Sequence, residues 1–237
     1  MIGKMFEPKA LQEALDILVR EFPLALWETA YVTVLATAFA IVLGLPLGVL
    51  LVAGEKDGVL PLPGWLMHAL NVVINLLRSV PFLILMILVF PLTRAIMGTT
   101  VGTAASVVPL VIAAFPFIAR LVESSLREVN PNIIEMAQSM GATPVQVIIR
   151  VMLPESVPGL ISGATIAITT ILGYSAMSGI IGGGGLGKIA INYGYYRYKY
   201  LVMLLAVILL ILLVQLFQSV GTRLAVRSDK RLRHRAQ

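Results

Sequence analysis

The chain has 237 residues, of which 58% are hydrophobic and only 13% are charged. Soluble domains are about 45–50% apolar and about 25% charged, so this composition excludes an ordinary cytosolic globular protein and a disordered chain. It also argues against nucleic-acid binding, in spite of the net charge of +6. The lack of cysteine excludes disulfides, thiolate metal sites and a cysteine nucleophile, and two histidines do not favour a histidine-based metal or catalytic cluster.

The N-terminal segment 1–26 is predicted to contain an amphipathic helix. Apolar side chains recur at helical spacing along residues 9–22, and polar side chains occupy the opposite side. The apolar side consists of Leu11, Leu15, Leu18, Val19 and Phe22. This pattern favours an interfacial helix that lies along the membrane. The acidic residues in this region argue against a cleavable signal peptide.

Five segments are long and apolar enough to cross a membrane, because a spanning helix needs about 20 residues. They are 31–53, 61–93, 95–119, 156–187 and 201–222. In the second segment we expect a helix from near Trp65 to about Pro91, with a break around 79–81. In the fourth, the helix should end near Met177, before a glycine-rich stretch. The first residues of the third are expected to be loop. The sequence therefore predicts an all-α membrane protein with five transmembrane helices.

Two local features of these spans are unusual. Gly44 and Gly48 form a G-x-x-x-G pattern, which is typical of close helix packing in membranes. Arg78 interrupts the apolar run 61–93, and a charge in such a position usually faces protein, water or the interface. We expect Arg78 either to reach the cytoplasmic edge of the membrane, or to stabilise the translocation path or pair with Glu123 or Glu155.

The charges at the loop ends predict the orientation. The tail 223–237 holds six basic residues and one acidic residue, and basic ends stay in the cytoplasm. Five spans then put the N-terminus outside the cell and the segments 54–64 and 120–157 inside. Lys188, Arg197 and Lys199 would lie outside, which weakens the argument. The expected division is an extracytoplasmic or interfacial segment 1–26, a transmembrane region 27–222 and a basic cytoplasmic tail.

The cytoplasmic segment 123–156 is too polar to span the membrane and carries clear helix signals. Asn130 followed by proline is typical of a helix start, and Gly141 is typical of a helix end. Thr143 with Gln146 has the spacing of a capping box at a second start. That second helix is expected to stop at Leu153–Pro154. Two interpretations stay open, namely a docking ridge for another protein and a plain hairpin on the membrane surface.

The same segment resembles a known family signature. Residues 135–154 read Glu135-Met136-Ala137, three residues, Gly141, nine residues, then Val151-Met152-Leu153-Pro154. This is similar to the "EAA" signature of ABC-transporter permeases, E-A-A-x3-G-x9-I-x-L-P, with Met136 and Val151 as departures that remain apolar. The runs 78–82, 116–120, 140–144, 182–187 and 193–195 follow in the order of the methionine-uptake permeases. The resemblance covers about 27–227.

This resemblance implies a subunit of a type I ABC importer in the bacterial inner membrane. It implies a homodimer of five-span subunits, two separate ATPase subunits that hold ATP and Mg²⁺, and an extracytoplasmic methionine-binding lipoprotein. It implies no cofactor in this chain, which also lacks a G-x4-G-K-[ST] loop. The short helix 131–140 would be the coupling helix in a groove of the ATPase. The contact residues would be Glu135, Met136, Ala137 and Gly141, with Leu153 and Pro154 at the end of the signature.

The translocation path is expected along the least oily span. Residues 165–177 are rich in hydroxyl side chains and end in the flexible Met177. We name Thr170, Tyr174, Ser175 and Met177 as candidate path or gate residues, and the family resemblance places 174–177 near the gate. The alternative for each residue is helix packing alone.

Other functions fit less well. A permease for another amino acid or a small polar solute is the main alternative to methionine. A secondary carrier would need a buried carboxylate in a span, and the uncharged spans supply none. An intramembrane serine enzyme built on Ser175 would need His68 or His234 as its base, and neither lies in a suitable segment. The G-x-G-x-x-G run at 182–187 lacks the strand and the acidic residue of a dinucleotide site.

Overall fold

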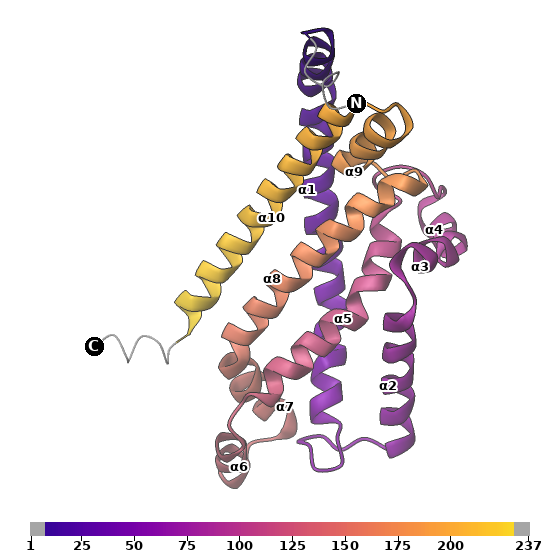
Figure 1. Cartoon of the computed structure of the whole chain (residues 1–237). Helices are drawn as coiled ribbons and strands as arrows, with labels where there is room; N and C mark the ends of the chain where they lie inside the picture. The colour runs from indigo at the N-terminus through magenta and orange to yellow at the C-terminus, as the bar shows by residue number, and fades with distance from the viewer. Residues whose placement is uncertain (1–7, 230–237) are drawn as a thin grey trace. The chain divides into compact units, whose positions relative to one another are not determined.

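Figure 1 shows the computed structural model, in which residues 8–229 are described. Within this range all regular elements are helices. Four helical stretches are long and apolar enough to cross a membrane, or five if the broken pair α2 and α3 counts as one span. The stretches are Leu11–Ala53 in α1, Val107–Arg127 in α5, Pro144–Ile181 around α8 and Tyr200–Ser228 in α10. The prediction of an all-α membrane protein is confirmed.

The chain divides into two compact units, and each of the long helices except α5 contributes a substantial part to both. Unit 1 consists of Met1–Thr37, Pro81–Val111 and Ile168–Phe217. Unit 2 consists of Ala38–Val80, Ile112–Ala167 and Gln218–Gln237. Unit 2 therefore contains the predicted cytoplasmic segments 54–64 and 123–156.

Helix α1 (Pro8–Ala53) joins two elements that are predicted as separate from the sequence. The predicted surface helix 9–22 continues without a break into the first span. Its apolar side is divided, because Phe22 is buried while Leu11, Leu15 and Val19 are exposed. In unit 1 three buried side chains of α1 pack in one cluster with later elements of the chain. This cluster contains Ala14, Phe22, Ala25, Leu186, Ile189, Val202 and Ala206.

Polar contacts support this packing in unit 1. Lys199 forms an ion pair with Glu13 at 2.6 Å. The Tyr193 hydroxyl donates to the Glu21 carboxylate, and this hydrogen bond is the main cause that raises the pKa of Tyr193 above its ordinary value. The first turns of α1 are therefore tied to residues 193–199 by apolar and polar contacts.

Within unit 2, α1 lies close to α5 (Val107–Arg127) at the predicted glycine pair. A Cβ atom at Gly44 would lie 2.8 Å from the carbonyl oxygen of Phe115. A Cβ atom at Gly48 would lie 2.6 Å from the carbonyl oxygen of Ala119. Real Cβ atoms do not approach backbone that closely, so the pattern marks a helix contact that only glycine permits. The packing prediction is confirmed.

The second predicted span is broken where expected. Helix α2 (Gly64–Ser79) ends before Val80, and α3 (Phe82–Leu88) begins after Pro81. Because proline disfavours helical backbone in the residue before it, Val80 is extended. A short helix α4 (Phe90–Met97) follows, and its C-cap is Gly98 at φ +74°.

Two span boundaries differ from the prediction. The expected span 95–119 starts later and ends later, since α5 runs from Val107 to Arg127. The charged side chains at 120, 123 and 127 therefore lie on the helix rather than in a cytoplasmic loop. Helix α10 (Tyr200–Ser228) also continues past the expected end at 222.

The predicted stop at Leu153–Pro154 is wrong. Helix α7 (Pro144–Val147) continues through a π-helix, η2 (Ile148–Met152), into α8 (Leu153–Ser178). Proline removes an N–H donor and clashes with the preceding turn of an α-helix. The wider π turn, in which the Leu153 N–H donates to the carbonyl of Ile148, loosens the turn that precedes Pro154. The helix therefore continues through the proline.

The glycine-rich stretch after α8 consists of short helical turns that pack closely against neighbouring residues. It contains a 3₁₀ turn, η3 (Gly179–Ile181), and the short helices α9 (Gly185–Ile189) and η4 (Ala190–Tyr196). Glu28 of α1 accepts hydrogen bonds from the Thr103 hydroxyl at 2.9 Å and from the Gly185 N–H at 2.7 Å. A Cβ atom at Gly184 would lie 2.0 Å from the Thr103 hydroxyl oxygen, so this glycine is required by close approach.

Candidate functional site

Helix α6 (Pro131–Ser139) begins as the sequence predicts. Its N-cap is Asn130, whose side-chain oxygen accepts a hydrogen bond from the Asn132 N–H at 3.0 Å. Pro131 occupies the first helical position, where its missing N–H costs nothing. Both signals are local, so the start of α6 depends on no distant part of the chain.

The end of α6 is equally well defined. Gly141 has φ +82°, and its N–H donates to the Gln138 carbonyl at 2.9 Å. The Ala142 N–H donates to the Ala137 carbonyl at 3.1 Å. This pair of bonds is the Schellman arrangement, which needs a left-handed residue at the position of Gly141. The predicted helix end at Gly141 is confirmed.

The next helix starts with the predicted capping box. The Thr143 side-chain oxygen accepts from the Gln146 N–H at 3.4 Å, and the Gln146 side chain accepts from the Thr143 N–H at 2.9 Å. Helix α6 is therefore capped at both ends and followed at once by another capped start. Helix α6 contacts both α7 and η2, and these contacts hold α6 against the start of the following helix.

Helix α6 presents apolar side chains that are not buried within the chain. No residue from Pro131 to Ser139, all within the described part of the chain, is buried. Met136 is 59% exposed and Met140, four residues later, is 81% exposed. Glu135 is also exposed, and Ala137 is half-buried. Residues four apart lie on one helix face, so the two methionines form an exposed ridge.

The two ends of the signature are in different elements. Glu135, Met136, Ala137 and Gly141 belong to α6 and its cap. Leu153, which is half-buried, and Pro154, which is exposed, belong to the first turn of α8.

The candidate path residues occupy the end of α8 in unit 1. The Tyr174 ring stacks on Phe82 of α3, with centroids 4.5 Å apart and an angle of 5° between the planes. Met177 is 45% exposed, and Thr170 is half-buried. Ser175 is buried, and its hydroxyl donates to the Leu172 carbonyl at 2.8 Å. This bond within the helix favours the packing interpretation for Ser175.

Arg78 lies in the last turn of α2 and is exposed. Glu123, one of the two carboxylates suggested as its partner, binds Arg120 and Arg127. The exposure of Arg78 favours the interpretation in which its charge reaches the membrane edge.

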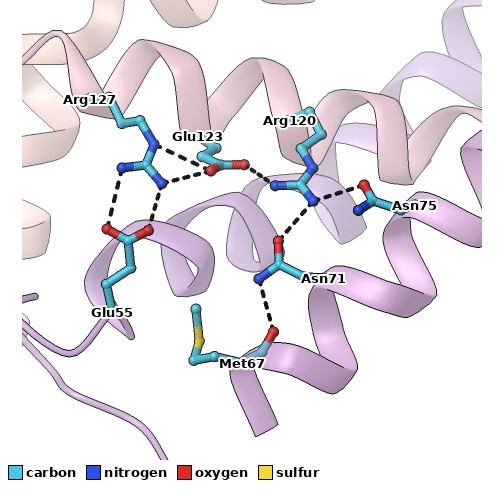
Figure 2. A network of polar contacts seen from close by, with 7 residues as sticks. All are labelled: Glu55, Met67, Asn71, Asn75, Arg120, Glu123 and Arg127. Carbon is cyan, nitrogen blue, oxygen red and sulfur yellow. Dashed lines mark hydrogen bonds and ion pairs between the residues drawn. The ribbon is translucent and has the colours of Figure 1, made fainter. Parts of the chain in front are cut away.

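Figure 2 shows a polar network at the end of α5 that is not among the sites predicted from the sequence. One oxygen of Glu123 accepts from Arg120 at 2.7 Å, and the other accepts from Arg127 at 2.9 Å. Arg127 also donates with both terminal nitrogens to Glu55, at 2.6 and 3.3 Å. The two arginines and two carboxylates balance one another in formal charge.

The network extends from α5 to α2. The second terminal nitrogen of Arg120 donates to the side-chain oxygens of Asn71 at 2.8 Å and Asn75 at 2.9 Å. Asn71 donates in turn to the Met67 carbonyl at 2.9 Å (Figure 2). A sequence signal for part of this network exists, because charges at 120, 123 and 127 have helical i,i+3 and i,i+4 spacing. Nothing in the spacing indicates Glu55, Asn71 or Asn75.

Comparison with known proteins identifies the family. A family model described as "Binding-protein-dependent transport system inner membrane component" matches residues 40–234. The chain belongs to this family. It is accordingly an inner-membrane component with several apolar helices, and its relatives include curated permease proteins.

Two relatives illustrate the likeness within this family. The chain is 50% identical over 208 residues to a Vibrio cholerae protein described as "Probable D-methionine transport system permease protein MetI", covering 87% of this chain and 92% of that protein. It is 44% identical over 153 residues to the Escherichia coli K12 "D-methionine transport system permease protein MetI", covering 65% of this chain and 70% of that protein.

Solved structures show the same fold. A chain of the structure "Inward facing conformations of the MetNI methionine ABC transporter: CY5 native crystal form" matches with a TM-score of 0.86 and 42% identity, covering 91% of this chain and 98% of that chain. An amino acid ABC transporter crystallised with histidines matches with a TM-score of 0.73 at 16% identity, which supports the fold alone. The chain therefore has the type I ABC permease fold.

Proposed function

We propose that this protein is the permease subunit of an ATP-driven importer and forms the translocation path for methionine. The observation that carries the proposal is the match to a chain of the MetNI methionine transporter over 98% of that chain at 42% identity. Relatives named as D-methionine permeases, at 42–50% identity over most of the chain, support the same substrate. Both stereoisomers of methionine are candidate substrates.

The protein works as a homodimer with two separate ATPase subunits and an extracytoplasmic methionine-binding lipoprotein. ATP and Mg²⁺ belong to the ATPase, so the permease needs only to transmit movement. Support for a docked partner comes from α6, where Met136 and Met140 expose apolar surface on a helix that is capped at both ends. Such a helix fits a groove on another protein.

The contact with the ATPase consists of Glu135, Met136, Ala137 and Gly141, with Leu153 and Pro154 holding the end of the segment. The path and its gate lie at Thr170, Tyr174, Ser175 and Met177. For the gate, the stack of Tyr174 on Phe82 and the exposure of Met177 support a side-chain arrangement that can repack. Arg78 faces the membrane edge, which its exposure supports.

The C-terminus lies in the cytoplasm and the N-terminus outside. The division into two units supports this orientation. The segments 54–64 and 123–156, which are both expected inside, belong to the same unit, unit 2. This orientation places the basic residues Lys188, Arg197 and Lys199 outside, which is unfavourable because basic residues favour the cytoplasmic side. The charge of Lys199 is compensated by its ion pair with Glu13, which is also expected outside.

Reconstituted uptake tests the proposal. The chain, its ATPase and the binding protein are placed in liposomes, and uptake of labelled methionine is measured with and without ATP. ATP-dependent uptake that excess unlabelled methionine suppresses is expected. Uptake driven by an ion gradient without the ATPase would instead identify a secondary carrier. ATP-dependent uptake of another labelled solute, with none of methionine, would identify a different substrate.

The docking role of α6 has its own variant. Met140→Asp places a charge on the exposed ridge and should abolish co-purification of the ATPase, because an apolar groove excludes an unpaired carboxylate. Met97→Asp is the matched control, since Met97 is an exposed methionine at the end of α4. Equal co-purification of the ATPase with both variants would contradict the assignment of α6.

A further inference from the structure

The polar network of unit 2 stands at the base of α6. Arg127 is the last residue of α5, and Asn130 is the N-cap of α6, so only two residues separate them. One of these, Val129, is buried, and its N–H donates to the Leu126 carbonyl at 3.3 Å. The connection between α5 and α6 is therefore short and packed. A displacement of α6 would be transmitted through it to Arg127.

The contacts of Arg127 carry such movement beyond α5. Glu55 lies two residues after the end of α1, in the connection to α2. Arg127 donates two hydrogen bonds to the Glu55 carboxylate, and the planar guanidinium fixes the direction of both. Glu123 then links Arg127 to Arg120, whose other nitrogen holds Asn71 and Asn75 on α2. The chain of contacts joins the base of α6 to the connection after α1 and to the middle of α2.

Burial makes the centre of this chain sensitive to its partners. The side chain of Glu123 is 13% exposed, whereas those of Arg127 and Glu55 are 47% and 45% exposed. A carboxylate with so little water contact depends on both arginines for its compensation. The centre of the network is thus Glu123, which holds both arginines in place.

We propose that Arg127 and Glu55 are positioning residues that transmit the movement of α6 to the α1–α2 connection and to α2 during transport. This inference rests on the proposed function, because it assumes that an ATPase moves α6. It assigns the coupling of ATP hydrolysis to transport in part to an ion pair outside the family signature. Glu123 holds Arg127 in place, and Arg120 extends the link to Asn71 and Asn75.

The test uses the reconstituted transporter and measures methionine taken up per ATP hydrolysed. Arg127→Lys keeps the positive charge but cannot donate the two parallel hydrogen bonds to Glu55. Glu55→Gln keeps the size of the side chain and removes its negative charge. Each should lower uptake per ATP at least about fivefold, a modest coupling free energy, while ATP hydrolysis continues. The double variant should show no further loss, because both changes break the same link. Arg94→Lys, at an exposed arginine of α4, is the control and should leave the ratio unchanged.

Two outcomes separate this inference from the proposed function. If Arg127→Lys and Glu55→Gln only reduce the amount of assembled transporter, with uptake per ATP as in the wild type, the residues are structural and the inference is overturned. If the wild-type transporter shows no ATP-driven methionine uptake, the proposed function fails first. The ratio of uptake to hydrolysis is independent of protein yield, so a poorly folding variant does not imitate the expected result.

Discussion

Replacement of Gly141 by alanine tests the geometry that ends α6. The backbone at this position has φ +82°, and a Cβ atom there would meet nothing within 4 Å. Steric contact with the rest of the chain therefore adds nothing to the effect. The remaining cost is that of placing an L-residue in the left-handed region, about 1–2 kcal/mol. Since 1.4 kcal/mol is a factor of ten in an equilibrium constant, this corresponds to about a 5- to 30-fold shift.

Amide hydrogen exchange measures this cost where it acts. The Ala142 N–H, which donates to the Ala137 carbonyl, reports opening of the cap. Its exchange should become about 5–30 times faster in Gly141→Ala, because the free-energy cost of the left-handed residue favours the open cap. Gly141→Asn should show a smaller change, because asparagine tolerates this backbone conformation better than alanine.

Gly98 supplies a matched control on another helix. It caps α4 at φ +74°, and a Cβ atom there would also meet nothing within 4 Å. Gly98→Ala should carry a similar conformational cost at α4 but leave exchange at Ala142 and ATP-driven uptake as in the wild type. Gly141→Ala should reduce uptake. Unchanged exchange at Ala142 in Gly141→Ala would refute the argument that a left-handed residue holds this helix end.

Two further predictions concern packing and use thermal unfolding in detergent. Gly48→Ala should destabilise the protein by about 1–3 kcal/mol, because the added methyl group would lie 2.6 Å from the Ala119 carbonyl oxygen and must push α1 away from α5. Gly64→Ala, in open space at the start of α2, should be neutral or stabilising, and an equal loss in both variants would count against the packing argument. Tyr174→Ala should lose the ring stack on Phe82, worth about 0.5–1.5 kcal/mol beyond its buried area, whereas Tyr174→Phe should keep it. A Tyr174→Phe variant as unstable as Tyr174→Ala would show that the hydroxyl, not the stack, stabilises this site.

The sequence by itself determined the features that depend on neighbours in the chain. The caps of α6 and α7 use groups two to five residues apart, so Asn130, Gly141 and Thr143 could be assigned from their spacing. The membrane spans follow from the length of apolar runs, because the thickness of the bilayer sets a minimum helix length. The break near Pro81 follows from the covalent geometry of proline.

Tertiary structure decided the features that depend on distant partners. Arg127 and Glu55 are 72 residues apart in sequence, and Glu28 and Gly185 are 157 apart, so no local pattern pairs them. The helix that passes through Pro154 also escaped prediction, because the turn before this proline is π-helical, and the sequence around it does not indicate that wider turn. Local spacing therefore predicts contacts within one helix, and only the packed fold brings together charges that are distant in sequence.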